Sequence, residues 1–140
     1  MTDNVEVVLE VFRAVERRDP QGVLALYHPE VQFHDPPSLP YGGRHVGFAS
    51  AVMNAHRWAE TWDAVQTEAE RKMDPRVVAA SEDEVVVLYR QRAVDRAGRR
   101  FDNPVVGIYR VRDSKLHWAQ MFHFDTAAIL SFLEEAERAL

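Results

Sequence analysis

The periodicity of the hydrophobic residues changes once along this chain, near Trp62. Before that point apolar residues recur at helical spacing, and after it they alternate or run together as they do in strands. Helical segments followed by a series of strands favour an α+β fold over one in which helices and strands alternate. The length of 140 residues fits a single domain that spans residues 1–140.

The first half of the chain is expected to hold three helices and one short strand. The helices are predicted at 5–15, 19–27 and 47–62, and the strand at 31–35. Pro36 and Pro37 follow the strand and have no N–H to donate to a neighbouring strand, so regular pairing should end near Asp35.

The second half is expected to supply most of the sheet. Strand-like segments are predicted at 65–70 (weakly alternating), 76–80, 85–94, 101–111 and 116–124, with turns at 95–98 and 112–115. Asp125 and Thr126 then cap a closing helix. A curved antiparallel sheet wrapped around helices leaves a hollow that side chains do not fill, so a pocket is expected there.

Composition excludes several classes of protein. The chain has no cysteine, which rules out disulfides and thiolate metal sites, and its formal net charge of −5 disfavours nucleic-acid binding. The sequence shows neither an apolar run long enough to span a membrane nor a signal-like N-terminus, so a cytoplasmic location is expected. His34 and Asp35 cannot supply three converging ligands, and there is no glycine-rich phosphate loop, so neither a metal nor a cofactor is expected.

Asp35 is the strongest candidate for a catalytic group. A carboxylate at the end of a strand, beside an apolar opening, is well suited to act as a general base. The alternative is that it only caps the turn before Pro36, which aspartate often does. If Asp35 points into the pocket, strand alternation makes Phe33 point inward as well and turns His34 to the other face.

The order of these segments resembles the nuclear transport factor 2-like superfamily of cone-shaped α+β barrels. Within it, the chain is most similar to the SnoaL-like polyketide cyclase and ketosteroid isomerase-like branch. Three stretches carry the resemblance: 18–31, 35–47 with its Pro-Tyr-Gly-Gly loop, and 106–125. The resemblance implies that Asp35 is the carboxylate that moves a proton next to a carbonyl group.

Other catalytic positions of these relatives are not matched. Val11 and Gly107 stand where the isomerases are expected to hold an oxyanion, and Met121 stands where the cyclases carry an aspartate. Arg90 and Arg92 have no carboxylate between them, unlike the arrangement of limonene epoxide hydrolase-like members. Both arginines are expected on the outer face of the sheet, paired with acids.

The remaining site residues follow from the resemblance together with strand alternation. His123 is expected to face inward with Met121 and to share the cavity with Asp35, or else to sit inert at the sheet edge. Asn103 and Tyr109 could replace the missing oxyanion donors. The residues expected to contact the substrate are Phe33, Tyr41 (over the mouth), His56 (alternatively a core histidine), Asn103, Tyr109 and Met121.

These observations favour a cofactor-independent acid/base enzyme of the isomerase, aldol cyclase or dehydratase type. Its ligand would be a small hydrophobic carbonyl compound, such as a polyketide or a steroid-like molecule. The alternatives are a non-catalytic binding or interaction domain of the same fold, or a water-activating hydrolase of the epoxide hydrolase type. Trp118, Gln120 and Phe122 should form an outward stripe on the last strand, which predicts a homodimer through the outer face of the sheet.

Overall fold

The structure is a computed structural model that describes residues 3–139, and it contains five helices and six strands within that range. The helices are α1 (Asn4–Glu16), α2 (Pro20–Ala25), α3 (Phe48–Asp63), α4 (Glu68–Arg71) and α5 (Thr126–Arg138). The strands are β1 (Tyr27–Asp35), β2 (Gly43–Val46), β3 (Arg76–Ala80), β4 (Glu84–Val94), β5 (Arg100–Arg112) and β6 (Lys115–His123).

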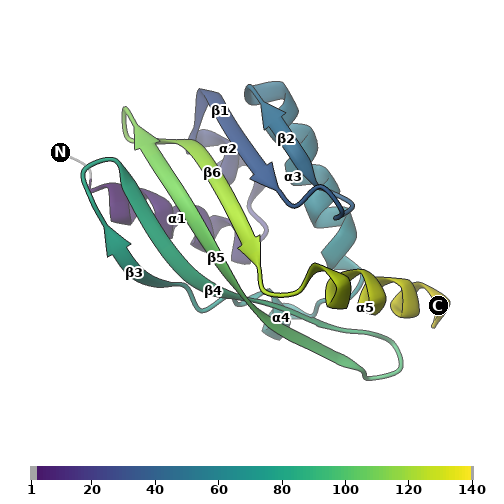
Figure 1. The fold of residues 1–140 in the computed structure, drawn as a ribbon. Helices are drawn as coiled ribbons and strands as arrows, with labels where there is room; N and C mark the ends of the chain where they lie inside the picture. The colour runs from purple at the N-terminus through teal and green to yellow at the C-terminus, as the bar shows by residue number, and fades with distance from the viewer. Residues whose placement is uncertain (1–2, 140) are drawn as a thin grey trace.

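The six strands form one curved sheet with the order β2-β1-β6-β5-β4-β3. Helices α1, α2 and α3 lie on one side of this sheet, and α5 extends from the end of β6 (Figure 1). The predicted α+β fold with a curved sheet around the N-terminal helices is confirmed. The sheet is mixed, because β1 runs parallel to β6 while every other neighbouring pair is antiparallel.

The helices begin where the sequence supplies a capping side chain. The carboxylate of Asp3 accepts from the N–H of Val5 at 3.0 Å, and Asp125 accepts from Ala128 at 3.0 Å. Asp19 caps α2 in the same way and is followed by Pro20 in the first turn. These contacts satisfy N–H groups that have no partner inside the helix.

Two segments differ from the sequence-based prediction. The expected strand at 65–70 is wrong: a short helix, α4, forms there, because Thr67 and Glu70 make a capping box with a 2.7 Å bond from the Thr67 N–H to Glu70. Strand β1 begins at Tyr27, where a helix was expected, because Tyr27 pairs with Leu116 of β6. The edge strand β2 lies in a segment that was predicted to be a loop.

Alternation along the strands separates the two faces of the sheet. In β4, for example, Val85, Val87 and Tyr89 are buried against the helices, while Arg90 and Arg92 lie on the opposite face. A first core cluster fills the space between α1 and the sheet, and a second one joins Trp62, Phe101 and α5. Together they surround the region where the cavity lies.

Candidate functional site

A cavity of about 410 Å³ lies between the helices and the inner face of the sheet. Most of its wall is apolar, with Val11, Phe12, Val23, Leu24, Phe33 and Met121 among the lining residues. A hollow of this size and character can enclose a small hydrophobic molecule. Phe33 and Met121 both line it, as the resemblance and strand alternation together led us to expect.

Asp35 is the last residue of β1, and its side chain lines this cavity. The residue is only 9% exposed. Burial raises the pKa of Asp35 to about 7, and a 3.4 Å hydrogen bond from the Asn54 amide partly opposes this rise. The carboxyl group can therefore gain and lose a proton near neutral pH, as a general base must.

His123 is the last residue of β6 and also lines the cavity. Its neighbour Phe122 is exposed on the other face, as the alternation predicts. Burial lowers the pKa of His123 to about 4, so the imidazole is neutral near pH 7. Its Nδ1 atom is buried and has no hydrogen-bond partner among the described residues.

All four tyrosines of the chain line this one cavity: Tyr27, Tyr41, Tyr89 and Tyr109. Burial raises the pKa of each, so all four phenols keep their protons at neutral pH. Tyr41 was expected to cover the mouth, but it is 1% exposed and lies within the wall, where Trp62 donates to its hydroxyl at 3.2 Å. The cavity thus offers several O–H donors around a single buried carboxyl group.

Tyr89 and Tyr109 lie close together in the wall, because the ring of Phe12 packs edge-on against both, with ring centroids at 5.0 Å and 5.7 Å. Burial is the main reason why the pKa of Tyr109 is raised, so its hydroxyl keeps its proton near neutral pH. A protonated phenol can donate its O–H to a ligand. Tyr89 was not predicted as a site residue, although the alternation of β4 could have placed it on the inner face.

Gly107 makes room for this phenol. A Cβ atom at position 107 would lie 2.3 Å from the Tyr109 hydroxyl oxygen and 2.5 Å from two ring carbons. The hydroxyl therefore occupies the space that a side chain at 107 would fill. A phenol donor stands at the place where the resemblance expects an acidic oxyanion donor on the penultimate strand.

Substituting Gly107 by alanine is expected to displace the Tyr109 ring and to destabilise the fold by about 1–3 kcal/mol, because the added methyl group overfills a packed site. Urea denaturation followed by tryptophan fluorescence would measure the loss. In a Tyr109→Leu background the same substitution should cost much less, since the clashing ring is gone. An equal cost in both backgrounds would contradict this account.

Two other predicted residues lie further from the centre of the cavity. His56 on α3 is among the lining residues but is exposed, so it sits at the rim. Asn103 is not part of the wall. It pairs with Gln91, two residues beyond the point where Val105 faces His123, and so β5 carries it past the end of the cavity. The expectation that Asn103 supplies a donor to the ligand is therefore not supported by its position.

Asn54 is a site residue that the sequence analysis missed. It lies on the buried face of α3 and is 6% exposed. Its amide nitrogen donates a hydrogen bond to Asp35, and its Oδ1 has no partner among the described residues. The available signal was a polar residue three positions after the buried Ala51, on the stripe where a helix normally places apolar residues.

The two arginines of β4 lie outside the cavity, as expected. Arg90 donates to Asp102 at 2.8 Å, and Arg92 donates to Asp74 at 2.6 Å. Neither is among the residues that line the cavity. They therefore cannot select an anionic ligand there.

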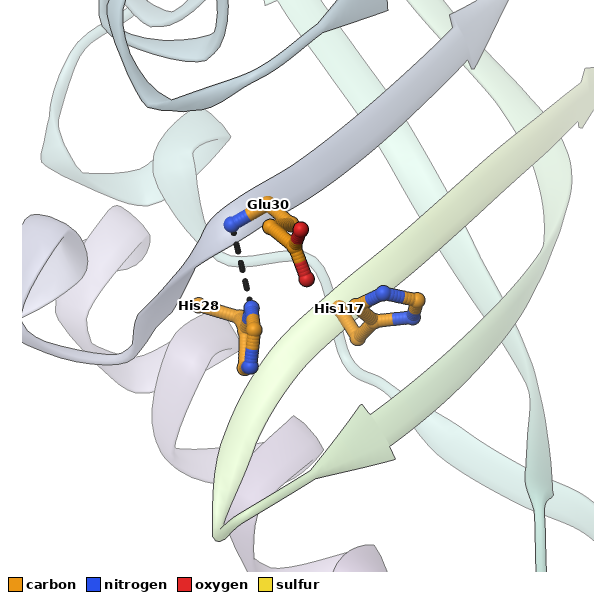
Figure 2. A group of neighbouring side chains, drawn as sticks. All are labelled: His28, Glu30 and His117. Atoms are coloured by element: carbon orange, nitrogen blue, oxygen red, sulfur yellow. Dashed lines mark hydrogen bonds between the residues drawn. The ribbon is translucent and has the colours of Figure 1, made fainter.

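A second polar cluster lies outside the cavity, where His28 and Glu30 of β1 stand beside His117 of β6 (Figure 2). Ligand atoms of the three side chains lie within 4.8 Å of one another, a proximity that the sequence analysis did not foresee. The Glu30 N–H donates to His28 Nδ1 at 3.0 Å, so the neutral ring carries its proton on Nε2, which faces Asp113 at 3.6 Å. A metal would have to displace that bond or that proton, and the absence of a bound metal stays a prediction.

Comparison with protein families gives one match over most of the chain. A family model described as a SnoaL-like domain matches residues 8–119. No curated protein matches the sequence. None of the helices in the described part of the chain is long and apolar enough to cross a membrane.

Several solved structures share this fold. TerC, co-crystallised with polyporic acid, has 22% identity and a TM-score of 0.78 over 94% of this chain and 98% of that one. An NTF2-like protein from Burkholderia pseudomallei has 24% identity and a TM-score of 0.78 over 95% and 98%. A protein with a ketosteroid isomerase-like fold from Catenulispora acidiphila, in complex with trimethylamine, has 13% identity and a TM-score of 0.67 over 90% of each chain. At these identities the likeness concerns the fold.

Proposed function

This chain belongs to the family of SnoaL-like domains, and on that premise we propose that it is a cofactor-independent acid/base enzyme for a small hydrophobic carbonyl compound. One observation carries the proposal: a single buried carboxyl group, Asp35, with its pKa raised to about 7, stands in an apolar cavity lined by phenols. The solved structure of TerC with polyporic acid supports a small organic molecule as the ligand.

In the proposed reaction, the Asp35 carboxylate takes a proton from the carbon next to the carbonyl group. The Tyr109 hydroxyl donates to the oxygen on which negative charge develops, and neutral His123 provides a further hydrogen bond. Asp35 then returns the proton to the same or another carbon, which gives an isomer. Alternatively, the carbanion attacks a second carbonyl group of the ligand, whose oxygen takes the proton from Asp35, or it expels a β-hydroxyl group, which leaves as water with that proton. A positioned general base contributes about 10²–10⁴ in rate, and each oxyanion donor about 10²–10³.

Proton abstraction, the first step of the proposed reaction, can be tested with a simple ketone in place of the substrate. Exchange of the α-protons of 2-tetralone for deuterium in buffered D₂O can be followed by NMR. The enzyme should accelerate this exchange over buffer, and Asp35→Asn should remove the acceleration. If the wild-type protein gives no acceleration with 2-tetralone or with other cyclic ketones, the proposed reaction is wrong.

A purely ligand-binding domain is the second candidate. The apolar side chains at Val11 and Met121, where relatives are expected to carry catalytic groups, favour it. Binding of bicyclic ketones without proton exchange would support this alternative. A water-activating hydrolase is less well supported, because the other carboxylates of the wall, Asp19 and Asp63, are already engaged as a helix cap and as the partner of Arg18.

A homodimer through the outer face of the sheet is part of the proposal. Phe122 on β6 is 48% exposed there, and Trp118 lies beneath Arg110, whose guanidinium is 4.4 Å from the ring centroid. An apolar stripe of this kind commonly marks a partner surface.

Phe122→Glu is expected to convert the dimer to a monomer, because it would place a charge at the centre of the contact. Sedimentation velocity measures the change. Met53→Glu is the matched control, since Met53 is 59% exposed on α3, away from the sheet, and the variant should stay dimeric. A monomeric wild-type protein at micromolar concentration would contradict the dimer.

A further inference from the structure

Asn54 is one of the residues that line the cavity, and its side chain contacts Asp35. Its amide nitrogen donates to Asp35 Oδ2 at 3.4 Å, while its Oδ1 is buried and has no partner in the part of the chain that the structure describes. Buried polar atoms in folded proteins are almost always paired. An unpaired oxygen on a residue that lines a cavity therefore calls for a partner from the ligand.

The orientation of this amide follows from the chemistry of its neighbour. An ionised carboxylate can only accept hydrogen bonds, so the N–H side of the amide must face Asp35. The oxygen is then left for the ligand, and its partner must be a donor, either O–H or N–H.

Charge decides between these donors. Of the described residues that line the cavity, Arg18 is the one arginine or lysine, and its guanidinium is already occupied by Asp63 at 2.7 Å, by the Val15 carbonyl at 2.7 Å and by Gln66. An anionic ligand would therefore meet no available cation in the wall. An amine would be protonated and would pair with Asp35, which would remove the base. A neutral hydroxyl group can donate to Asn54 Oδ1, needs no cation in the wall and leaves Asp35 free to act as the base.

We infer that Asn54 is a specificity-determining residue and that the ligand is a neutral hydroxylated carbonyl compound. Its hydroxyl donates to Asn54 Oδ1 while the acidic C–H lies at Asp35. Because the two side chains are in contact, the hydroxyl and the acidic carbon are only a few bonds apart. The placement of the C–H rests on the proposed function, whereas recognition of the hydroxyl by Asn54 can be measured without turnover.

The test compares two probes of the same size, 2-naphthol and 2-methylnaphthalene, in fluorescence titrations at pH 7. The quantity of interest is the dissociation constant for 2-methylnaphthalene divided by that for 2-naphthol. Asn54→Leu should lower this ratio about tenfold, because it removes the acceptor and keeps the bulk. Asn103→Leu is the matched control: it removes an amide of the same type outside the cavity wall, and it should leave the ratio within about twofold of wild type.

Asn54→Ala provides a second variant if the leucine does not fold, and it should lower the ratio in the same direction. An unchanged ratio in both Asn54 variants would overturn the assignment, as would an equal fall in Asn103→Leu. Failure of the proposed function has a different signature. If the wild-type protein does not accelerate α-proton exchange of ketones, the proposed enzymatic function is wrong. If its preference for 2-naphthol still depends on Asn54, the recognition of the hydroxyl group by Asn54 stands.

Discussion

Replacing Asp35 by asparagine is expected to slow α-proton exchange of 2-tetralone by about 10²–10⁴-fold, the usual contribution of a positioned general base. The amide is close to the carboxylate in size, and its oxygen can still accept the bond from Asn54 that now reaches Asp35 at 3.4 Å. The cavity should therefore keep its shape, so the loss should appear in kcat rather than in binding. NMR measures the rate, and circular dichroism checks the fold.

Asp63→Asn is the control for this change, because Asp63 is another carboxylate of the cavity wall but is paired with Arg18 at 2.7 Å. That variant should retain exchange. The wild-type rate should also rise with pH and level off above about 7, because burial raises the pKa of Asp35 to about 7 and only the ionised form is a base. Asp35→Asn with undiminished exchange would end the proposed mechanism.

The same buried carboxyl group should make the protein lose stability as the pH rises. Between the ordinary aspartate pKa of 3.8 and the folded value of about 7, the unfolded chain ionises Asp35 and the folded protein does not. The unfolded state then binds fewer protons, so the free energy of unfolding falls by about 1.4 kcal/mol per pH unit through this window. The full effect is about 4 kcal/mol, reached above pH 7.

Urea denaturation of wild type and Asp35→Asn between pH 5 and pH 8.5 would show this effect as a difference. The asparagine variant cannot ionise, so it should become progressively more stable than wild type as the pH rises to 7, and the difference should then level off. Taking the difference cancels groups common to both proteins, among them His123, whose lowered pKa acts in the acid range. A pH-independent difference would mean that Asp35 is not held in a dry environment.

The sequence predicted the fold well because its signals are local. Asp19 followed by Pro20, and Asp125 before the last helix, mark helix starts through contacts within one turn. The apolar first half of 85–94 placed that strand, and the expected outer position of its two arginines is confirmed. The segment 65–70 was misassigned because its weak alternation outweighed the pairing of Thr67 with Glu70, a capping signal three residues apart.

The candidate site was predicted only in part, because it is assembled from elements distant in the chain. Asp35, Met121 and His123 all line the cavity, but alternation grouped residues by face without saying which face is the inner one, and the resemblance supplied that direction. Alternation could not say where along a strand the cavity ends, and so Asn103 was included. It also could not show that Tyr89 joins Tyr109 in the cavity wall or that Asn54 reaches Asp35 from α3, since no spacing within the chain encodes those positions.

By itself, the sequence determined most of the kinds of element, most of their boundaries, and the place of a carboxylate at the end of the first strand. These depend on backbone propensity, capping and the period of side-chain direction, which act over a few residues. The tertiary structure alone decided that all four phenols share one hollow with that carboxylate, and that this hollow is dry enough to raise the pKa of Asp35 to about 7. Burial depends on everything packed around a group, and that packing exists only once the helices have closed over the sheet.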